Sequence, residues 1–212
     1  MASPASIIDD AEIRARWSGF AWTDANAKAA KAIIAQYPEG RQMSASIPLL
    51  DLAQRQVGAE TNTQGWLPIP VMEYVAAELD MPVIRILEVA TFYTMFNLSP
   101  VGKYFVQICG TTPCMLRGSE ELKDILRRMI GPEKKVTADG LFSWMEVECL
   151  GACVNAPMAQ INQDYFEDLT PDSLTTLLNK LKSGVGVKPG PQSNRQFSAP
   201  ASGMRTLLDT GA

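Results

Sequence analysis

Apolar residues recur at helical spacing along the first hundred residues of the chain. The clearest stripe follows Thr23, a residue type that favours the N-cap of a helix. Its members, at positions i, i+3, i+4 and i+7, are Ala30, Ile33, Ile34 and Tyr37. Comparable stripes predict helices over about 46–57, where Gly58 is the expected stop, over about 70–79, and from residue 83 onwards. Packing of these stripes against one another accounts for them, so we expect a small helical bundle.

From Lys103 the pattern changes to short β-prone runs separated by helical stretches. The expected strands are Tyr104–Ile108, Leu141–Glu148, Met158–Ile161 and Tyr165–Leu169. The expected helices are Glu120–Ile130 and a last one from the N-cap Thr170 to about Leu181. The order β-α-β, β-β, α predicts an α+β chain of two parts, a helical bundle followed by an α/β domain.

The C-terminal stretch from residue 183 is rich in Gly, Pro and Ser and has no periodic apolar face. We interpret it as an extended tail that orders only on a partner, if at all. The predicted domains are therefore a helical domain over 1–98, an α/β domain over 99–183 and a tail over 184–212.

Composition and charge exclude several classes of protein. The 212 residues are 46% apolar, 8% aromatic and 20% charged, which is typical of a globular chain. A net charge of −4 without a Lys/Arg stripe disfavours nucleic-acid binding. Between Pro70 and Thr94 the only basic residue is Arg85, so a helix-turn-helix DNA-binding motif is also disfavoured. The chain has no histidine, so imidazole metal ligands and histidine-activated nucleophiles are excluded.

No apolar run approaches 18 residues, and the acidic N-terminal stretch has no apolar core of a signal peptide. We therefore expect a soluble protein without a signal peptide or direct membrane insertion, in a compartment where disulfides are rare. No Rossmann G-x-G-x-x-G and no P-loop occur, so we expect the chain alone to bind neither NADH nor ATP.

The four cysteines form the most informative pattern in the sequence. Cys109-x4-Cys114 and Cys149-x3-Cys153 are separated by 34 residues, and each pair follows a predicted strand. The intervening residues have the length and pattern of one βαβ unit, which makes its two strands parallel. If those strands are close in the sheet, their C-terminal ends meet at one edge, and all four thiols converge there.

Four converging thiolates predict a metal site, for which zinc and iron–sulfur clusters are the candidates. Structural zinc commonly uses tight C-x2-C loops, whereas both loops here are wider and suit the two irons of a [2Fe–2S] cluster. Four unrelated buried thiols, two disulfides and a C-x-x-C thiol oxidoreductase are weaker alternatives, the last because neither pair has that spacing. A zinc-stabilised interaction module is the alternative from another functional class.

The runs PVGKYFVQICGTTPCMLRG (100–118) and ECLGACVNAPM (148–158) carry a family signature. With YPEGRQMSASIPLLDLAQRQ (37–56), GWLPIPVM (65–72) and EVATFYTMFNLSPVGK (88–103), they resemble the family of 24-kDa subunits of proton-pumping NADH:quinone oxidoreductase, respiratory complex I. The resemblance implies a helical N-terminal domain before a thioredoxin-like ferredoxin domain. It also implies that the ligands of one [2Fe–2S] cluster are Cys109, Cys114, Cys149 and Cys153.

The resemblance further implies an electron-transfer subunit that is not catalytic alone. Its cluster would exchange an electron with FMN on a partner flavoprotein subunit, which also binds NADH. A second expected partner is the large iron–sulfur subunit of the same complex, in the peripheral arm at the cytoplasmic face of the inner membrane. The equivalent diaphorase subunit of an NAD-reducing hydrogenase or an NAD-dependent formate dehydrogenase is the alternative within the family.

Three finer predictions concern the site itself. Each loop is short enough to chelate a single ion, so Cys109 and Cys114 should hold one iron and Cys149 and Cys153 the other. Thioredoxin-like folds carry a cis proline before an antiparallel hairpin, which predicts a cis bond at Ala156-Pro157. Glu148 adjoins a ligand, and its carboxylate is expected to lower the potential of the cluster if it lies nearby.

Overall fold

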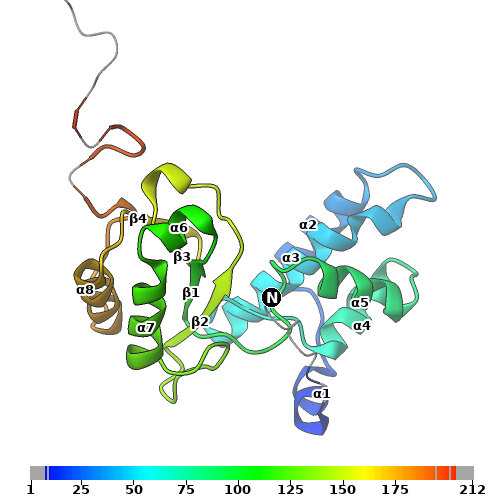
Figure 1. Ribbon diagram of the computed structural model, residues 1–212. Coiled ribbons are helices and arrows are strands. Elements are labelled where there is room, and N and C mark those ends of the chain that lie inside the picture. Colours follow the sequence, from blue (N-terminus) through cyan, green and yellow to red (C-terminus); the bar gives the residue numbers. More distant parts are fainter. Residues whose placement is uncertain (1–7, 9, 194, 201, 204–212) are drawn as a thin grey trace, which may run out of the picture. The chain divides into compact units, whose positions relative to one another are not determined.

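The computed structural model describes residues 8, 10–193, 195–200 and 202–203. The chain divides into two compact units, Met1–Lys103 and Tyr104–Ala212 (Figure 1). The finer division into 1–98, 99–183 and 184–212 stays a prediction. The remaining positions of the predicted N-terminus and tail lie outside the described residues. In the described ranges, none of the helices is long and apolar enough to span a membrane.

The first unit is built of helices, as the periodic stripes predict. Its elements are α1 (Ala11–Trp17), α2 (Asp24–Ile34), the 3-10 turn η1 (Gln42–Ala45), α3 (Ser46–Thr61), α4 (Ile69–Glu78) and α5 (Val83–Phe92). The Thr23 side chain accepts from the Asn26 N–H and caps α2. The core is formed by fully buried apolar side chains that include Leu49, Leu50, Met72, Val75 and Ile86.

Two features of this unit differ from the sequence prediction. Helix α1, capped by Asp10, was not expected. The stop expected at Gly58 is wrong, because α3 continues through this residue to Thr61. A Cβ at position 58 would lie 2.9 Å from the Thr63 carbonyl oxygen. The glycine therefore allows the following loop to fold back onto α3, and it serves close packing instead of ending the helix.

The second unit contains a five-stranded sheet with helices. Its elements are β1 (Tyr104–Cys109), α6 (Thr112–Leu116), α7 (Ser119–Met129), β2 (Phe142–Val147), the 3-10 turn η2 (Cys153–Asn155), β3 (Ala159–Ile161), β4 (Asp164–Glu167), α8 (Pro171–Lys182) and β5 (Gly190–Pro191). The strand order is β2-β1-β3-β4-β5. β1 is parallel to β2 and antiparallel to β3, β3 is antiparallel to β4, and β5 is parallel to β4.

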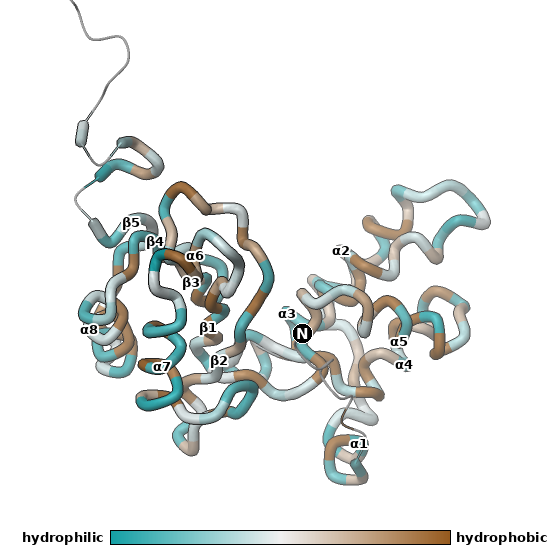
Figure 2. Tube along the Cα trace, viewed as in Figure 1, coloured by the Kyte–Doolittle hydropathy of each residue, from teal (hydrophilic) through white to brown (hydrophobic). Residues whose placement is uncertain are grey.

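One hydrophobic core joins the sheet to α7 and α8, which contact each other. Leu122 and Leu126 of α7 and Leu174 and Leu178 of α8 are buried in it, together with Trp144 of β2. Figure 2 shows the hydrophobic colour on β1 and β3, whereas much of α7 is hydrophilic. α7 thus offers one apolar stripe to the sheet and a charged face elsewhere, the usual pattern of a surface helix.

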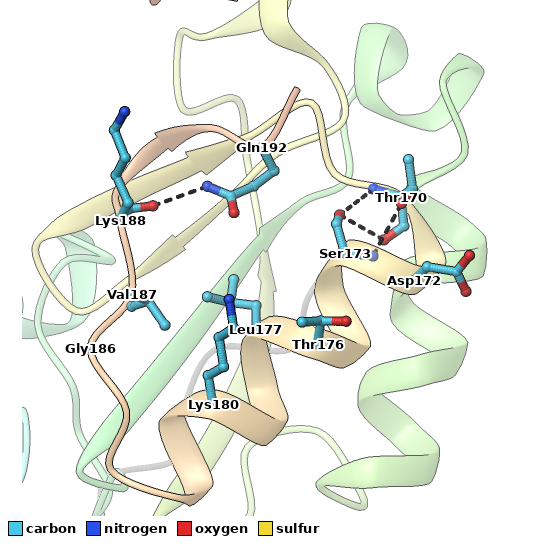
Figure 3. A pocket seen from close by; sticks show the side chains of 10 residues that line it. All are labelled: Thr170, Asp172, Ser173, Thr176, Leu177, Lys180, Gly186, Val187, Lys188 and Gln192. Carbon is cyan, nitrogen blue, oxygen red and sulfur yellow. Dashed lines mark hydrogen bonds between the residues drawn. The ribbon is translucent and has the colours of Figure 1, made fainter. Parts of the chain in front are cut away.

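The Gly-, Pro- and Ser-rich segment after α8 is attached to this unit. Val187 packs against the core, and β5 pairs with β4 so that Phe166 lies opposite Gly190. Figure 3 shows the segment beside α8, where the Gln192 side chain donates to the Lys188 carbonyl oxygen at 3.1 Å. The expectation that the segment orders only on a partner is therefore wrong for β5 and its neighbours, because backbone pairing and one apolar anchor suffice to hold them.

Candidate metal centre

The four cysteines lie on two loops that leave one edge of the sheet. Cys109 is the last residue of β1, and Cys114 lies in the short helix α6. Cys149 lies just beyond β2, and Cys153 begins η2. β1 and β2 are parallel neighbours, with Cys109 opposite Val147. The parallel pairing predicted from the βαβ spacing is confirmed, and it brings both cysteine loops to the same end of the strands.

The thiols are arranged as two pairs. The Sγ atoms of Cys149 and Cys153 are 3.5 Å apart. Two thiolates on one tetrahedral metal ion, each about 2.3 Å from it, lie about 3.8 Å apart, so this spacing suits chelation of one ion. The side chains of Cys109 and Cys114 also interact with each other. Within the described part of the chain, no group of three or more His, Cys, Asp or Glu side chains could hold a single metal ion.

In the first pair, Cys109 and Cys114, one thiol has a lowered pKa. Burial raises the pKa of Cys109, but hydrogen bonds from Thr111 and from the Leu150 backbone outweigh burial and lower the pKa overall. The Thr111 Oγ1 atom lies 3.3 Å from Cys109 Sγ. Burial and the neighbouring Cys109 raise the pKa of Cys114 to about 12. Near neutral pH the second thiol of the pair therefore stays protonated, and a bound cation would favour its ionised form.

The second pair repeats this asymmetry at the surface. The Gly151 N–H, 3.4 Å from Cys149 Sγ, lowers the pKa of Cys149, as does the Cys153 thiol. Cys149 in turn raises the pKa of Cys153. Charge on Cys109 acts on Cys153, and charge on Cys153 acts on Cys114, so the sulfurs of the two loops repel one another when ionised. A cationic metal core relieves this repulsion, and the donor set fits such a group.

The two pairs differ in exposure. Cys109 and Cys114 are 2% and 1% exposed and pack with Ala156 and Met158 in a small cluster of their own. Cys149 and Cys153 are exposed. The Tyr165 hydroxyl donates to the Leu150 carbonyl oxygen at 2.8 Å and ties the exposed loop to β4. No pattern in the sequence marks Tyr165 for this contact.

A buried lysine supports the first loop and escaped the sequence analysis. The Lys123 ammonium group donates to Glu146 at 3.1 Å and also pairs with Glu120. A Cβ on Gly110 would lie 1.8 Å from Glu146 Oε1, so the carboxylate packs directly on the backbone that follows Cys109. The i, i+3 spacing of Glu120 and Lys123 is the signal that could have found half of this network.

The Ala156–Pro157 peptide bond is cis, which confirms the sequence prediction. Glu148 is exposed, and its effect on a cluster stays a prediction. The assignment of Cys109 with Cys114 to one iron, and of Cys149 with Cys153 to the other, also stays a prediction.

Comparison with known families and sequences gives one consistent result. The family model described as thioredoxin-like [2Fe-2S] ferredoxin matches residues 30–182. An NADH-quinone oxidoreductase subunit of Rickettsia bellii is 52% identical over 167 residues, which is 78% of this chain and 96% of that protein. The corresponding NADH-quinone oxidoreductase subunit of Rhizobium meliloti is 50% identical over 194 residues, covering 90% of this chain and 68% of that protein.

Solved structures show the same fold. A crystal structure of an NAD+-reducing [NiFe]-hydrogenase in the air-oxidized state aligns with a TM-score of 0.54 at 20% sequence identity. The H2-reduced state aligns with a TM-score of 0.52, also at 20% identity. The alignments cover 66% and 63% of this chain, and the chain spans about a quarter of each hydrogenase chain, 23% in both cases. The thioredoxin-like fold and the α+β class expected from the sequence are confirmed.

Proposed function

Because the chain belongs to the thioredoxin-like [2Fe-2S] ferredoxin family, we propose that it is the electron-transfer subunit of an NADH:quinone oxidoreductase. Its cluster is held by Cys109, Cys114, Cys149 and Cys153. The observation that carries this proposal is the pair of cysteine loops at one end of the parallel strands β1 and β2. When bound, a [2Fe–2S] cluster supplies one-electron redox chemistry.

The protein contributes the setting for that electron. The backbone N–H of Gly151 donates to Cys149 Sγ, and backbone groups of Leu150 and Met158 act on Cys109 and Cys114. Such donors stabilise negative charge on ligand sulfurs and so raise the potential at which an electron is accepted. Burial of the first pair opposes this effect, because a low dielectric disfavours added charge.

The partner in this proposal is the flavoprotein subunit that binds NADH and FMN. The hydride chemistry belongs to that subunit, and this chain is not catalytic alone. Exposed apolar side chains on the first unit, Ile84, Phe92 and Met95, support docking to another protein. The large iron–sulfur subunit is the second partner, and we place the assembly in the peripheral arm at the cytoplasmic face of the inner membrane.

Analysis of the purified full-length chain tests the cluster. We expect about two irons and two acid-labile sulfides per chain and, after reduction, an electron paramagnetic resonance signal of spin one-half. Quadruple replacement of the cysteines by serine should abolish all three. One tightly bound zinc without labile sulfide, in a sample offered both iron and sulfide, would overturn the proposal in favour of a zinc-stabilised module.

A second experiment tests the assignment to an NADH-linked complex. NADH should reduce the cluster when the flavoprotein subunit of the same complex is present, and it should leave the isolated chain oxidised. Dithionite reduces both samples and serves as the control that the cluster is intact. Reduction of the isolated chain by NADH, or no reduction in the copurified pair, would contradict the assignment.

A further inference from the structure

The segment from β5 onwards makes a partly buried ion pair with the corner between β4 and α8. We call residues 190–193 and 195–200 of this segment the C-terminal strap. Asp168 Oδ2 accepts from Ser193 Oγ at 2.7 Å and from Arg195 Nε at 2.6 Å. Arg195 Nη2 donates to the other carboxylate oxygen, Oδ1, so the pair is bidentate. The side chains of Arg195 and Asp168 are only 12% and 16% exposed.

The same guanidinium group reaches the exposed cysteine loop. Arg195 Nη2 donates to the carbonyl oxygen of Val154, the residue after Cys153, at 3.1 Å. Nη1 donates to the Ala199 carbonyl oxygen at 3.3 Å and closes the strap on itself. One planar group with several donors therefore links the strap, Asp168 and the backbone beside a cysteine, which a lysine ammonium cannot do from one position.

Asn155 makes a second link between the loop and the strap. Its side-chain nitrogen donates to the Phe197 carbonyl oxygen at 3.1 Å and to the Glu167 carboxylate. Its backbone carbonyl oxygen accepts from the Asp168 N–H at 2.8 Å. Asn155 is buried, although Cys149 and Cys153, which precede it in the chain, are exposed. The end of the loop is thus fixed by contacts from residues far away in the sequence.

We infer that the C-terminal strap is part of the cluster site and that Arg195 is a positioning residue for Cys153. The inference rests on the proposed function, since it takes Cys153 to be a ligand. Cys153 lies in a three-residue 3-10 turn at the surface, and such a turn has little secondary structure to hold it. The Arg195 contact fixes the following carbonyl group, and so it restricts the orientations of the Cys153 backbone that could release the metal.

The test compares the rate at which reconstituted protein loses its cluster absorbance to an iron chelator. Arg195→Gln should lose the cluster about tenfold faster than wild type, in the range found for partners of metal ligands. Arg195→Lys should also lose it faster while unfolding at the wild-type temperature, because the ammonium can pair with Asp168 but cannot also reach Val154. Arg55→Gln is the matched control, because it removes a guanidinium from an exposed pair with Asp51 in the other unit.

Two results of the chelator assay would overturn the inference. The first is loss of the cluster from Arg195→Gln at the wild-type rate. The second is a wild-type rate in Arg195→Lys, which would reduce Arg195 to a structural partner of Asp168.

Hydrogen exchange in metal-free protein separates this inference from the proposed function. Arg195→Gln should speed exchange of the Asp168 amide, which is bonded to Asn155, and leave the amides of β1 unchanged. If wild-type protein took up no iron and sulfide, the proposed function would fail, and this measurement would still test the strap. Unchanged exchange of the Asp168 amide would overturn the inferred role of the strap and leave the proposed function standing.

Discussion

The loop with Cys109 and Cys114 is buried, whereas the loop with Cys149 and Cys153 lies at the surface. The buried loop is held mainly by consecutive elements, since one cysteine ends β1 and the other lies in α6. The exposed loop depends on side chains from β4 and from the C-terminal strap. The comparison shows that one candidate cofactor can be held by elements of the domain core on one side and by side chains from β4 and the strap on the other.

The largest expected effect separates the two pairs in metal-free protein. Replacing Cys109 and Cys114 together by serine should lower the free energy of unfolding by about 2 kcal/mol, because hydroxyl groups are then buried in an apolar cluster. The same change at Cys149 and Cys153 should leave the free energy of unfolding within about 0.5 kcal/mol of the wild-type value, as at other surface positions. Urea unfolding of both variants measures the difference, and equal losses would refute the comparison.

Glycines in the two loops provide the next comparison. Gly110→Ala should lower the free energy of unfolding by about 2 kcal/mol, because the added Cβ overlaps the Glu146 carboxylate. Gly151→Ala meets no atom within 4 Å, but its φ of +83° should cost about 1 kcal/mol. Glu146→Ala should rescue Gly110→Ala and leave Gly151→Ala unchanged. Thermal unfolding of the single and combined variants measures these effects. If Glu146→Ala did not rescue Gly110→Ala, the overlap with Glu146 would not be the cause of the loss of stability.

The ion pairs of Lys123 should support the buried loop in a pH-dependent way. Burial lowers the pKa of Lys123, but Glu120 and Glu146 outweigh burial and raise it overall. A raised pKa stabilises the fold fully below the unfolded-state pKa of about 10.5, and this contribution is lost as pH rises through the folded-state value. Lys123→Met should therefore cost about 1 kcal/mol at pH 7 and less in strong alkali. Urea unfolding of the wild type and of Lys123→Met, at pH 7 and in alkali, checks this. A difference in unfolding free energy that is the same at both pH values would contradict it.

The smallest expected effect concerns the exposed loop. Tyr165→Phe removes the hydroxyl that donates to the Leu150 carbonyl oxygen, a contact worth about 1 kcal/mol or less. We expect faster loss of the cluster to a chelator, with little change in the unfolding temperature. Tyr104→Phe, in the same unit but outside the cysteine loops, is the control. A change of equal size in that control would show that the readout reports general stability.

The elements that the sequence predicted are those that can be recognised from residues close together in the chain. The helix of α7 was placed within one residue of its bounds because its apolar stripe is regular, and α8 because Thr170 and Pro171 mark its start. The cysteine spacing was informative for the same reason, since one helix, α7, and one strand, β2, lie between the pairs. The cis peptide bond was predictable only through the family resemblance.

The features that the sequence did not predict are either very short elements or contacts between residues far apart in the sequence. The five-residue helix α6 is too short to produce a periodic pattern. The strap was taken for a free tail because Gly, Pro and Ser say nothing about pairing with a strand more than twenty residues earlier. Arginine is a residue type common in solvated tails, and only the fold shows that Arg195 is partly buried against Asp168.

Strand β5 also decides how this sheet can meet other proteins. An open strand edge is a template for another chain, but Pro191 has no N–H to offer a further strand. At the opposite side, the Lys134 and Thr137 N–H groups donate to the Trp144 and Phe142 carbonyl oxygens of β2. A segment of the chain thus covers the β2 border of the sheet, and Pro191 makes the β5 border a poor template. Polymerisation edge to edge is disfavoured, and a partner must recognise loops and side chains instead of adding a strand.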